Sequence, residues 1–158
     1  MKQYVISVKV ENRSGVLARV AGLFSARGYN IDSLTVSATE DDTVSVITLV
    51  VQGDDRVIEQ VTKQLNKLID VIKVSDHTDS PAVQREMALI KVNSQPSKRA
   101  EIYQLAEIFR ADIADITLKS ITLGVKGDPK KIDNFVELLR PYGIREFLRT
   151  GRISLLKE

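Results

Sequence analysis

Residues 4–30 read YVISVKVENRSGVLARVAGLFSARGYN, and the hydrophobic period of the chain changes once inside this stretch. Over residues 4–10 every second residue is apolar, which predicts a β-strand with one face toward a core. After the polar break at residues 12–15 the apolar residues fall three and four apart. This spacing predicts an amphipathic helix from about Gly15 to Arg27.

The rest of the first half continues the same pattern. Ser14 is the expected N-cap of the first helix, and Gly28 stands where a left-handed C-cap is usual. Further elements are expected at residues 31–39 and 43–52 (a β-hairpin), after Asp54-Asp55 (a second helix) and at residues 70–75 (a strand). The order βαββαβ predicts a four-stranded antiparallel sheet with both helices on one face, the ferredoxin-like arrangement.

The pattern then restarts beyond a polar segment that ends in Pro81. The predicted elements of the second half are strands at 85–93, 113–117, 121–126 and 144–150, helices around 102–109 and from near Pro129, and a possible edge strand at 152–156. We therefore expect an α+β protein with two tandem ferredoxin-like domains, at residues 1–76 and 85–158, joined by a linker at 77–84. Each half is small, so mutual packing or oligomerisation is expected to contribute stability.

Composition removes most catalytic chemistry. The 158 residues include no cysteine and one histidine, His77, so thiol nucleophiles, Cys-ligated metals and His-based zinc sites are excluded. His77 falls in the linker and is expected to be solvated. No catalytic residue and no metal site is predicted.

Charged clusters have simpler explanations than active sites. Asp41-Asp42 and Asp54-Asp55 could be catalytic or metal-binding carboxylates, but a turn and a helix start favour acidic residues for local reasons. Arg145, Arg149 and Arg152 could meet RNA or an acidic partner, or could keep a strand edge soluble, which is the favoured interpretation.

Partners such as nucleic acid and membranes are not expected. The formal net charge is only +2, and Tyr4 is the only aromatic residue available on the central strands to stack a base. No signal segment is evident, and no apolar run approaches the roughly 18 residues that a membrane span requires. A cytoplasmic protein is the expectation.

The break after the first strand is the strongest candidate for a binding site. A helix N-terminus has unpaired N–H groups that can hold a carboxylate, and Gly15 would let a ligand approach the backbone closely. The amides of Asn12 and Asn30 could serve an ammonium and a carboxylate, and Val16, Leu17 and Ile31 could receive a small aliphatic side chain. The sequence thus suggests an amino-acid pocket; the alternative is that the same residues only form a turn and a cap.

Several motifs resemble the small, regulatory subunits of acetohydroxyacid synthase, also called acetolactate synthase. The resemblance covers essentially the whole chain and is carried by residues 11–20, 22–36, 63–71, 85–92 and 149–152. Ser154 and Leu118 depart mildly from the family pattern. The resemblance implies that the first domain is an ACT domain, a ferredoxin-like module that binds amino acids across a two-fold contact between protomers.

The same resemblance implies a function. Valine would bind at the dimer interface of the ACT domains, with the effector site lined by Asn12, Gly15, Val16, Leu17, Asn30 and Ile31. The chain would be a non-catalytic homodimer that activates a separate large subunit and confers feedback inhibition by valine in branched-chain amino acid biosynthesis. Thiamine diphosphate, Mg²⁺ and FAD are expected in that catalytic partner and no cofactor in this chain.

Two other kinds of protein share features of this pattern. A free-standing ACT sensor would bind valine without affecting any synthase. An acylphosphatase-like enzyme shares the topology, but its phosphate-cradling glycine and arginine loop has no counterpart after the first strand.

Overall fold

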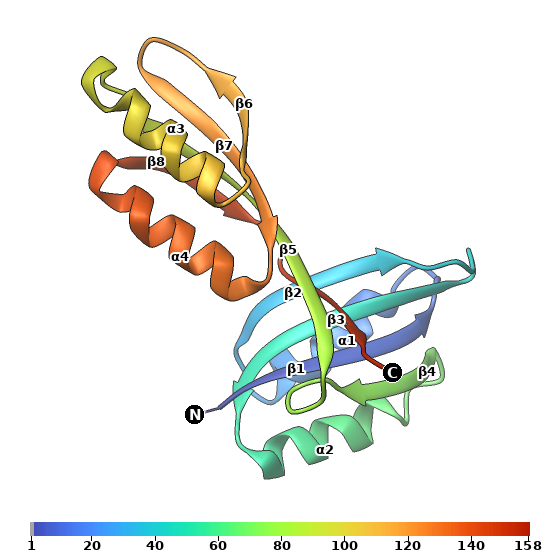
Figure 1. The fold of residues 1–158 in the computed structure, drawn as a ribbon. Helices are drawn as coiled ribbons and strands as arrows, with labels where there is room; N and C mark the ends of the chain where they lie inside the picture. Colours follow the sequence, from blue (N-terminus) through green and yellow to red (C-terminus); the bar gives the residue numbers. More distant parts are fainter. Residues whose placement is uncertain (1) are drawn as a thin grey trace. The chain divides into compact units, whose positions relative to one another are not determined.

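A computed structural model describes residues 2–158 and shows two compact units. One unit contains the residues up to Val83 together with Ile153–Glu158, and the other contains Gln84–Arg152. In each unit two helices cover one face of an antiparallel sheet (Figure 1). The predicted α+β fold of two βαββαβ repeats is confirmed.

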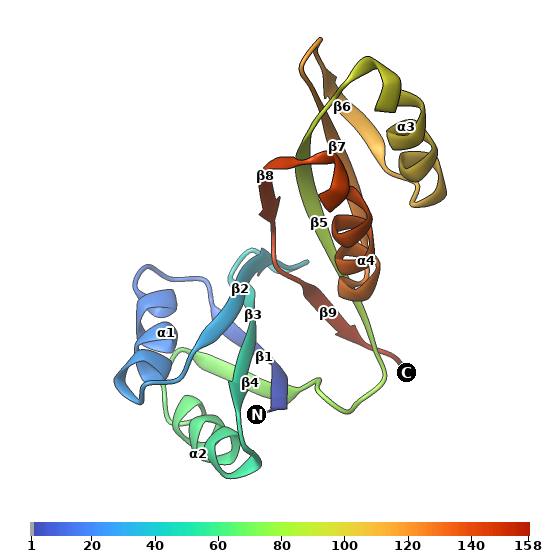
Figure 2. The ribbon, with the colours of Figure 1, turned by 90° about the vertical axis from the view of Figure 1, so that its left-hand side faces the viewer.

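The first unit follows the element order expected from the sequence. Its elements are β1 (Lys2–Glu11), α1 (Val16–Ala26), β2 (Ile31–Ala38), β3 (Val44–Gly53), α2 (Asp55–Leu65) and β4 (Val71–Asp76). The strands lie in the order β2-β3-β1-β4, and α1 and α2 lie on the same side of this sheet (Figure 2). Because β1 and β2 both pair antiparallel with β3, they run in the same direction and begin at the same edge of the unit.

The core of the first unit forms between the sheet and its helices. Alternate residues of β1 and β3 meet the apolar stripes of α1 and α2, as period-2 and period-3.6 patterns require. The buried residues are Tyr4, Ile6, Val8, Val10, Val16, Val20, Phe24, Ile47, Leu49, Val51, Ile58, Val61 and Leu65.

The acidic pairs have the local roles that the sequence favours. The Asp54 carboxylate accepts a hydrogen bond from the Val57 N–H at 2.9 Å and caps α2. In the β2–β3 turn, hydrogen bonds from the Thr43 hydroxyl and N–H lower the pKa of Asp41. Both interactions are local, whereas Asp55 accepts a hydrogen bond from the distant Tyr4 hydroxyl.

The second unit repeats the pattern with different residues. Its elements are β5 (Ala82–Asn93), the 3₁₀ turn η1 (Pro96–Lys98), α3 (Arg99–Ile108), β6 (Asp112–Ile116), β7 (Ser120–Gly127), α4 (Pro129–Leu139), the 3₁₀ turn η2 (Arg140–Tyr142) and β8 (Ile144–Arg149). The strand order is β6-β7-β5-β8. Its separate core includes the tilted rings of Phe109 and Phe135, whose centroids are 4.9 Å apart.

The last strand is β9 (Ile153–Leu156), which pairs with β5. Residues 153–158 group with the first unit, whereas the sequence-based boundaries assign them to the second domain. The Lys157 N–H donates to the Pro81 carbonyl at 2.9 Å, which ties this C-terminal segment to the segment before β5. None of the helices formed by residues 2–158 is long and apolar enough to span a lipid bilayer.

Candidate functional site

The loop between β1 and α1 is held against the β2–β3 turn. The Asn12 N–H donates to the Thr43 carbonyl at 2.7 Å, and the Asn12 side-chain amide donates to the Asp42 carbonyl at 3.1 Å. Asn12 is an exposed residue. This arrangement fixes where the chain enters α1.

The cap of α1 differs from the prediction. The N-cap residue is Gly15, not Ser14, and no side chain accepts a hydrogen bond from the first turn. The reason lies in the backbone: Gly15 has φ 85° and ψ −11°, a left-handed conformation that glycine adopts without steric cost. The Val16 N–H makes only a long hydrogen bond to the Arg13 carbonyl, at 3.5 Å, so the first turn retains hydrogen-bonding capacity for a ligand or water.

An arginine missed in the sequence analysis lies directly beside this loop. Arg19 donates from Nε to Asp70 Oδ2 at 2.9 Å, and its Nη2 lies 2.6 Å from the same oxygen. Its Nη1 would lie 3.1 Å from a Cβ built on Gly15. The available signal was the spacing of four residues, which puts positions 15 and 19 on the same side of the helix. The Arg19 guanidinium thus lies beside the uncapped first turn of α1.

The two aliphatic residues at this end of the helix have different surroundings. Val16 is 2% exposed and belongs to the core, whereas Leu17 is 42% exposed. Of the pair, only Leu17 has surface free for an aliphatic ligand.

Asn30 and Ile31 lie at the other end of α1. The Asn30 carbonyl accepts from the Gln52 N–H at 3.4 Å, and its side chain donates to Asp32 Oδ1 at 3.0 Å. The 11 residues of α1 separate the two groups by about 16 Å. One copy of the chain therefore does not bring the six predicted site residues together. They form two separate groups, one at each end of the helix.

His77 was expected to be solvated, and this prediction is wrong. The side chain is 5% exposed, and its Nδ1 lies 2.6 Å from the Ser154 hydroxyl. The chain continues alongside β1 after β4, because the His77 N–H donates to the Val5 carbonyl at 2.8 Å. Burial lowers the pKa of His77, with the nearby Asp76 acting in the opposite direction.

A shallow hollow of about 200 Å³ lies on the open face of the first sheet, where β9 approaches it. Its lining combines two lysines, three serines, one histidine and three aliphatic residues: Lys9, Lys73, Ser7, Ser75, Ser154, His77, Val46, Leu155 and Leu156. Lys9 and Lys73 are direct neighbours across the β1–β4 pair. The hollow is therefore cationic at one end.

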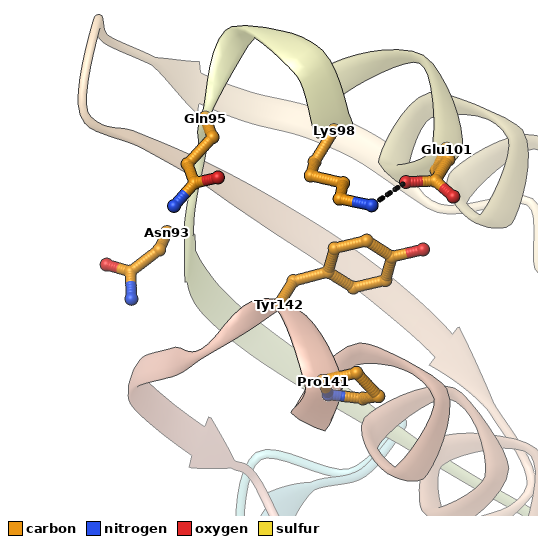
Figure 3. A pocket seen from close by; sticks show the side chains of 6 residues that line it. All are labelled: Asn93, Gln95, Lys98, Glu101, Pro141 and Tyr142. Atoms are coloured by element: carbon orange, nitrogen blue, oxygen red, sulfur yellow. Dashed lines mark ion pairs between the residues drawn. The ribbon is translucent and has the colours of Figure 1, made fainter.

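In the second unit, one hollow lies where β5 leads into η1 and α3. It measures about 250 Å³ and is lined by Asn93, Gln95, Lys98, Glu101, Pro141 and Tyr142. Figure 3 shows the ammonium group of Lys98 facing the Glu101 carboxylate near the Tyr142 ring, and the separation of the two charged groups is 3.5 Å. Since the two charges already satisfy each other, this hollow has little unbalanced charge to attract a ligand.

The three arginines near the C-terminus are engaged inside the second unit. Arg149 pairs with the nearly buried Glu86 and with Asp133. Arg145 donates to the Asn93 side chain at 2.6 Å, and Arg152 donates to the Gln84 side chain at 2.9 Å. Such contacts favour a structural role for this edge. Among residues 2–158, no group of three or more His, Cys, Asp or Glu side chains is arranged to hold a metal ion.

Comparison with known proteins gives consistent matches for both halves. The family model described as the AHAS small subunit-like ACT domain matches residues 6–73, and the model described as the small subunit of acetolactate synthase matches residues 85–158. Together the two matched ranges extend over most of both repeats.

Whole-chain relatives agree with the family models. The chain is 54% identical to a probable acetolactate synthase small subunit of Archaeoglobus fulgidus, covering 98% of this chain and 97% of the relative. It is 53% identical to the acetolactate synthase small subunit of Bacillus subtilis, covering 97% and 90%. The crystal structure of the acetolactate synthase small subunit from Thermotoga maritima is 38% identical, covers 100% of this chain and 99% of that one, and superimposes with a TM-score of 0.90. The chain therefore belongs to the family of acetolactate synthase small (regulatory) subunits, and its first unit contains the family's ACT domain.

Proposed function

We propose that this chain activates the catalytic large subunit of acetolactate synthase and makes that enzyme sensitive to valine. Catalysis, with thiamine diphosphate, Mg²⁺ and FAD, is assigned to the large subunit. The composition supports a non-catalytic role, because the chain has no cysteine and its one histidine is buried and held by Ser154. The same lack of cysteine suits a reducing cytoplasm.

The N-terminus of α1 is the proposed site for the carboxylate of valine. The observation that carries this assignment is the left-handed Gly15, which leaves the first-turn N–H groups without a side-chain cap beside the Arg19 guanidinium. The uncapped turn favours an anion because the helix dipole is positive at this end, and Arg19 Nη1, which does not contact Asp70, adds a hydrogen-bond donor on the same side. Leu17 supplies exposed aliphatic surface next to it.

A second copy of the chain would complete the site. Asn12 and Asn30 lie at opposite ends of α1, so a two-fold axis crossing the helix would place the loop of one protomer beside Asn30 and Ile31 of the other. The outer surface of α1 suits close approach, because Ala18 and Gly22 are exposed and a Cβ added at Gly22 would meet no atom within 4 Å. We therefore propose a homodimer with valine bound between the two α1 helices.

Inhibition then follows from linkage. Valine can inhibit only if it binds one arrangement of the complex more tightly than another. A ligand bound between two protomers stabilises the arrangement in which their ACT domains are in contact. The resulting shift in the conformation of the small-subunit dimer changes how the dimer contacts the catalytic subunit.

The test is reconstitution of the full-length chain with its large subunit. Gly15→Asp places a carboxylate where the ligand's carboxylate would bind, so the valine concentration for half-inhibition should rise at least about tenfold while activation is kept. Gly15→Asn is the matched control: it has the same size, lacks the charge and also tolerates a left-handed backbone. Equal valine sensitivity in the wild type and the Asp variant would contradict the site. Loss of activation in both variants would show that the loop serves folding or assembly instead.

A further inference from the structure

The second unit contains a basic hollow at the end where α3 finishes and α4 begins. It measures about 480 Å³ and is lined by Arg85, Arg110, Lys126, Gly127, Asp128 and Lys131. These residues come from β5, the end of α3, β7 and the start of α4. Four chain segments thus bring positive charge to one place in a protein whose formal net charge is only +2.

The four positive side chains of this hollow outnumber the one carboxylate in its lining. Within residues 2–158, none of the four cationic side chains forms an ion pair with a carboxylate. Lys131 Nζ donates to the Lys126 carbonyl at 3.0 Å, which fixes the position of this ammonium. The one carboxylate in the lining, Asp128, accepts from the Lys131 N–H at 2.8 Å and so caps α4. Like charges held together in this way repel each other and favour an anion between them.

The backbone conformation of Arg110 is an independent sign that its side chain has a function. This residue has φ 53° and is the only non-glycine residue with positive φ among residues 2–158. The equivalent position in the first unit is Gly28, with φ 71°. Both helices end with the same pair of hydrogen bonds: Gly28 N–H to Ser25 and Tyr29 N–H to Phe24, matched by Arg110 N–H to Glu107 and Ala111 N–H to Ala106.

This double hydrogen bond is the Schellman motif, whose left-handed residue is usually glycine. A side chain there strains the backbone, because its Cβ approaches the following carbonyl. The second unit therefore keeps an arginine at a position where the first unit has the conformationally suited glycine. That substitution is unfavourable for the backbone, and the charge it delivers to the hollow is a reason to retain it.

We propose that this basic hollow binds a small ligand with two or three adjacent phosphate groups. A chain of phosphates carries several negative charges within a few ångströms, which suits a hollow lined by four cationic side chains. Guanidinium groups bind phosphate oxygens through paired hydrogen bonds, and Arg85 and Arg110 supply two of them. No aromatic or large apolar side chain lines the hollow, so the phosphate chain itself is what the site recognises. It could be inorganic or part of a nucleotide.

Isothermal titration of the full-length chain with sodium tripolyphosphate tests the proposal. The wild type should bind one equivalent per chain, and binding should weaken as salt is raised. Arg110→Gly and Lys131→Gln should each weaken it about tenfold, as expected for loss of a charge-assisted hydrogen bond. Lys130→Gln is the matched control, since Lys130 is exposed on the same helix and does not line the hollow; its affinity should stay within about twofold of the wild type.

Arg110→Gly also separates binding from folding. Glycine relieves the left-handed strain, so the melting temperature of this variant should equal or exceed that of the wild type while binding is lost. Equal weakening by the Lys130 and Lys131 variants would overturn the proposal, because it would mean diffuse charge attraction. Absence of saturable binding would overturn it as well. A nucleoside triphosphate can be titrated in the same way. If it binds as tightly as tripolyphosphate and loses affinity in Arg110→Gly, the site recognises the phosphate chain alone. If it binds more tightly than tripolyphosphate and shows the same loss, the natural ligand is a nucleotide.

Discussion

Charged residues of the first unit differ sharply in how deeply their ion pairs are buried. The Asp70 side chain is 6% exposed and pairs with Arg19, whereas the Glu59–Lys63 pair on α2 is 69% and 72% exposed. A buried carboxylate that loses its partner retains the full desolvation cost, and an exposed one is rehydrated. Burial, more than distance, decides what each ion pair is worth.

Arg19→Gln is expected to lower the free energy of unfolding by about 2 kcal/mol, because it leaves the nearly buried Asp70 carboxylate without its counter-charge. Glu59→Gln should change it by less than about 0.5 kcal/mol. Urea unfolding followed by circular dichroism measures both. Equal effects of the two substitutions would show that the Arg19–Asp70 pair does not stabilise the fold. Arg19→Gln should also weaken valine binding, since Arg19 lies beside Gly15.

At the scale of elements, the C-terminal strand β9 is attached to the first unit through His77. The imidazole is buried against the Ser154 hydroxyl, and burial lowers its pKa. The charged groups around this position are Lys9 and Lys73 from the sheet and Asp76 from the same strand end. Protonation of His77 is therefore disfavoured in the folded chain and easier in the unfolded one.

Stability should consequently fall below about pH 6.5. Above the unfolded pKa of histidine, near 6.5, both states are neutral at this residue and it contributes no pH dependence. As the pH falls through that value the unfolded state binds the proton first, so the free energy of unfolding decreases, by at most about 1.4 kcal/mol per pH unit, and levels off below the folded pKa.

His77→Gln should remove the part of the pH dependence of stability that comes from histidine. The part that comes from the carboxylates should remain. Thermal unfolding between pH 5 and 8 measures the histidine part, and Ser154→Ala, which removes the partner hydroxyl but keeps the imidazole, is the control. If the wild type and His77→Gln show parallel pH profiles, His77 is not responsible for the loss of stability.

For the whole molecule, the proposed dimer gives a prediction about α1. Gly22→Gln should not disturb the isolated chain, because a Cβ at this position has open space and glutamine is a better helix former than glycine. If two α1 helices pack together, the longer side chain must separate them. Sedimentation should then show a shift from dimer to monomer.

The same variant should lose its response to valine. In the wild type, valine at one hundred times its dissociation constant adds about 2.7 kcal/mol to the free energy of unfolding, which raises the melting temperature by several degrees. Gln60→Ala on the exposed surface of α2 is the control and should keep both the dimer and the shift. A dimeric Gly22→Gln that still responds to valine would refute a ligand site between the α1 helices.

The sequence alone was enough to predict the two repeats and the positions of most helices and strands. The reason is that the spacing of apolar residues in each element is regular and depends only on nearby residues. Asp54 and Pro129 marked the starts of their helices correctly for the same reason. The composition also removed most catalytic chemistry, and the motifs around residues 11–36 pointed to the right family.

Only the tertiary structure decided which side chains meet. Ser14 does not cap α1, because the left-handed Gly15 redirects the chain, and backbone angles at a break have no periodic signal. His77 is buried because the chain folds back and places Ser154, 77 positions further along the sequence, against it. The Arg19–Asp70 pair and the basic hollow around Arg110 likewise join residues from separate elements. Hydrophobic periods record which face of an element is buried, whereas the partners across that face depend on how the chain closes in three dimensions.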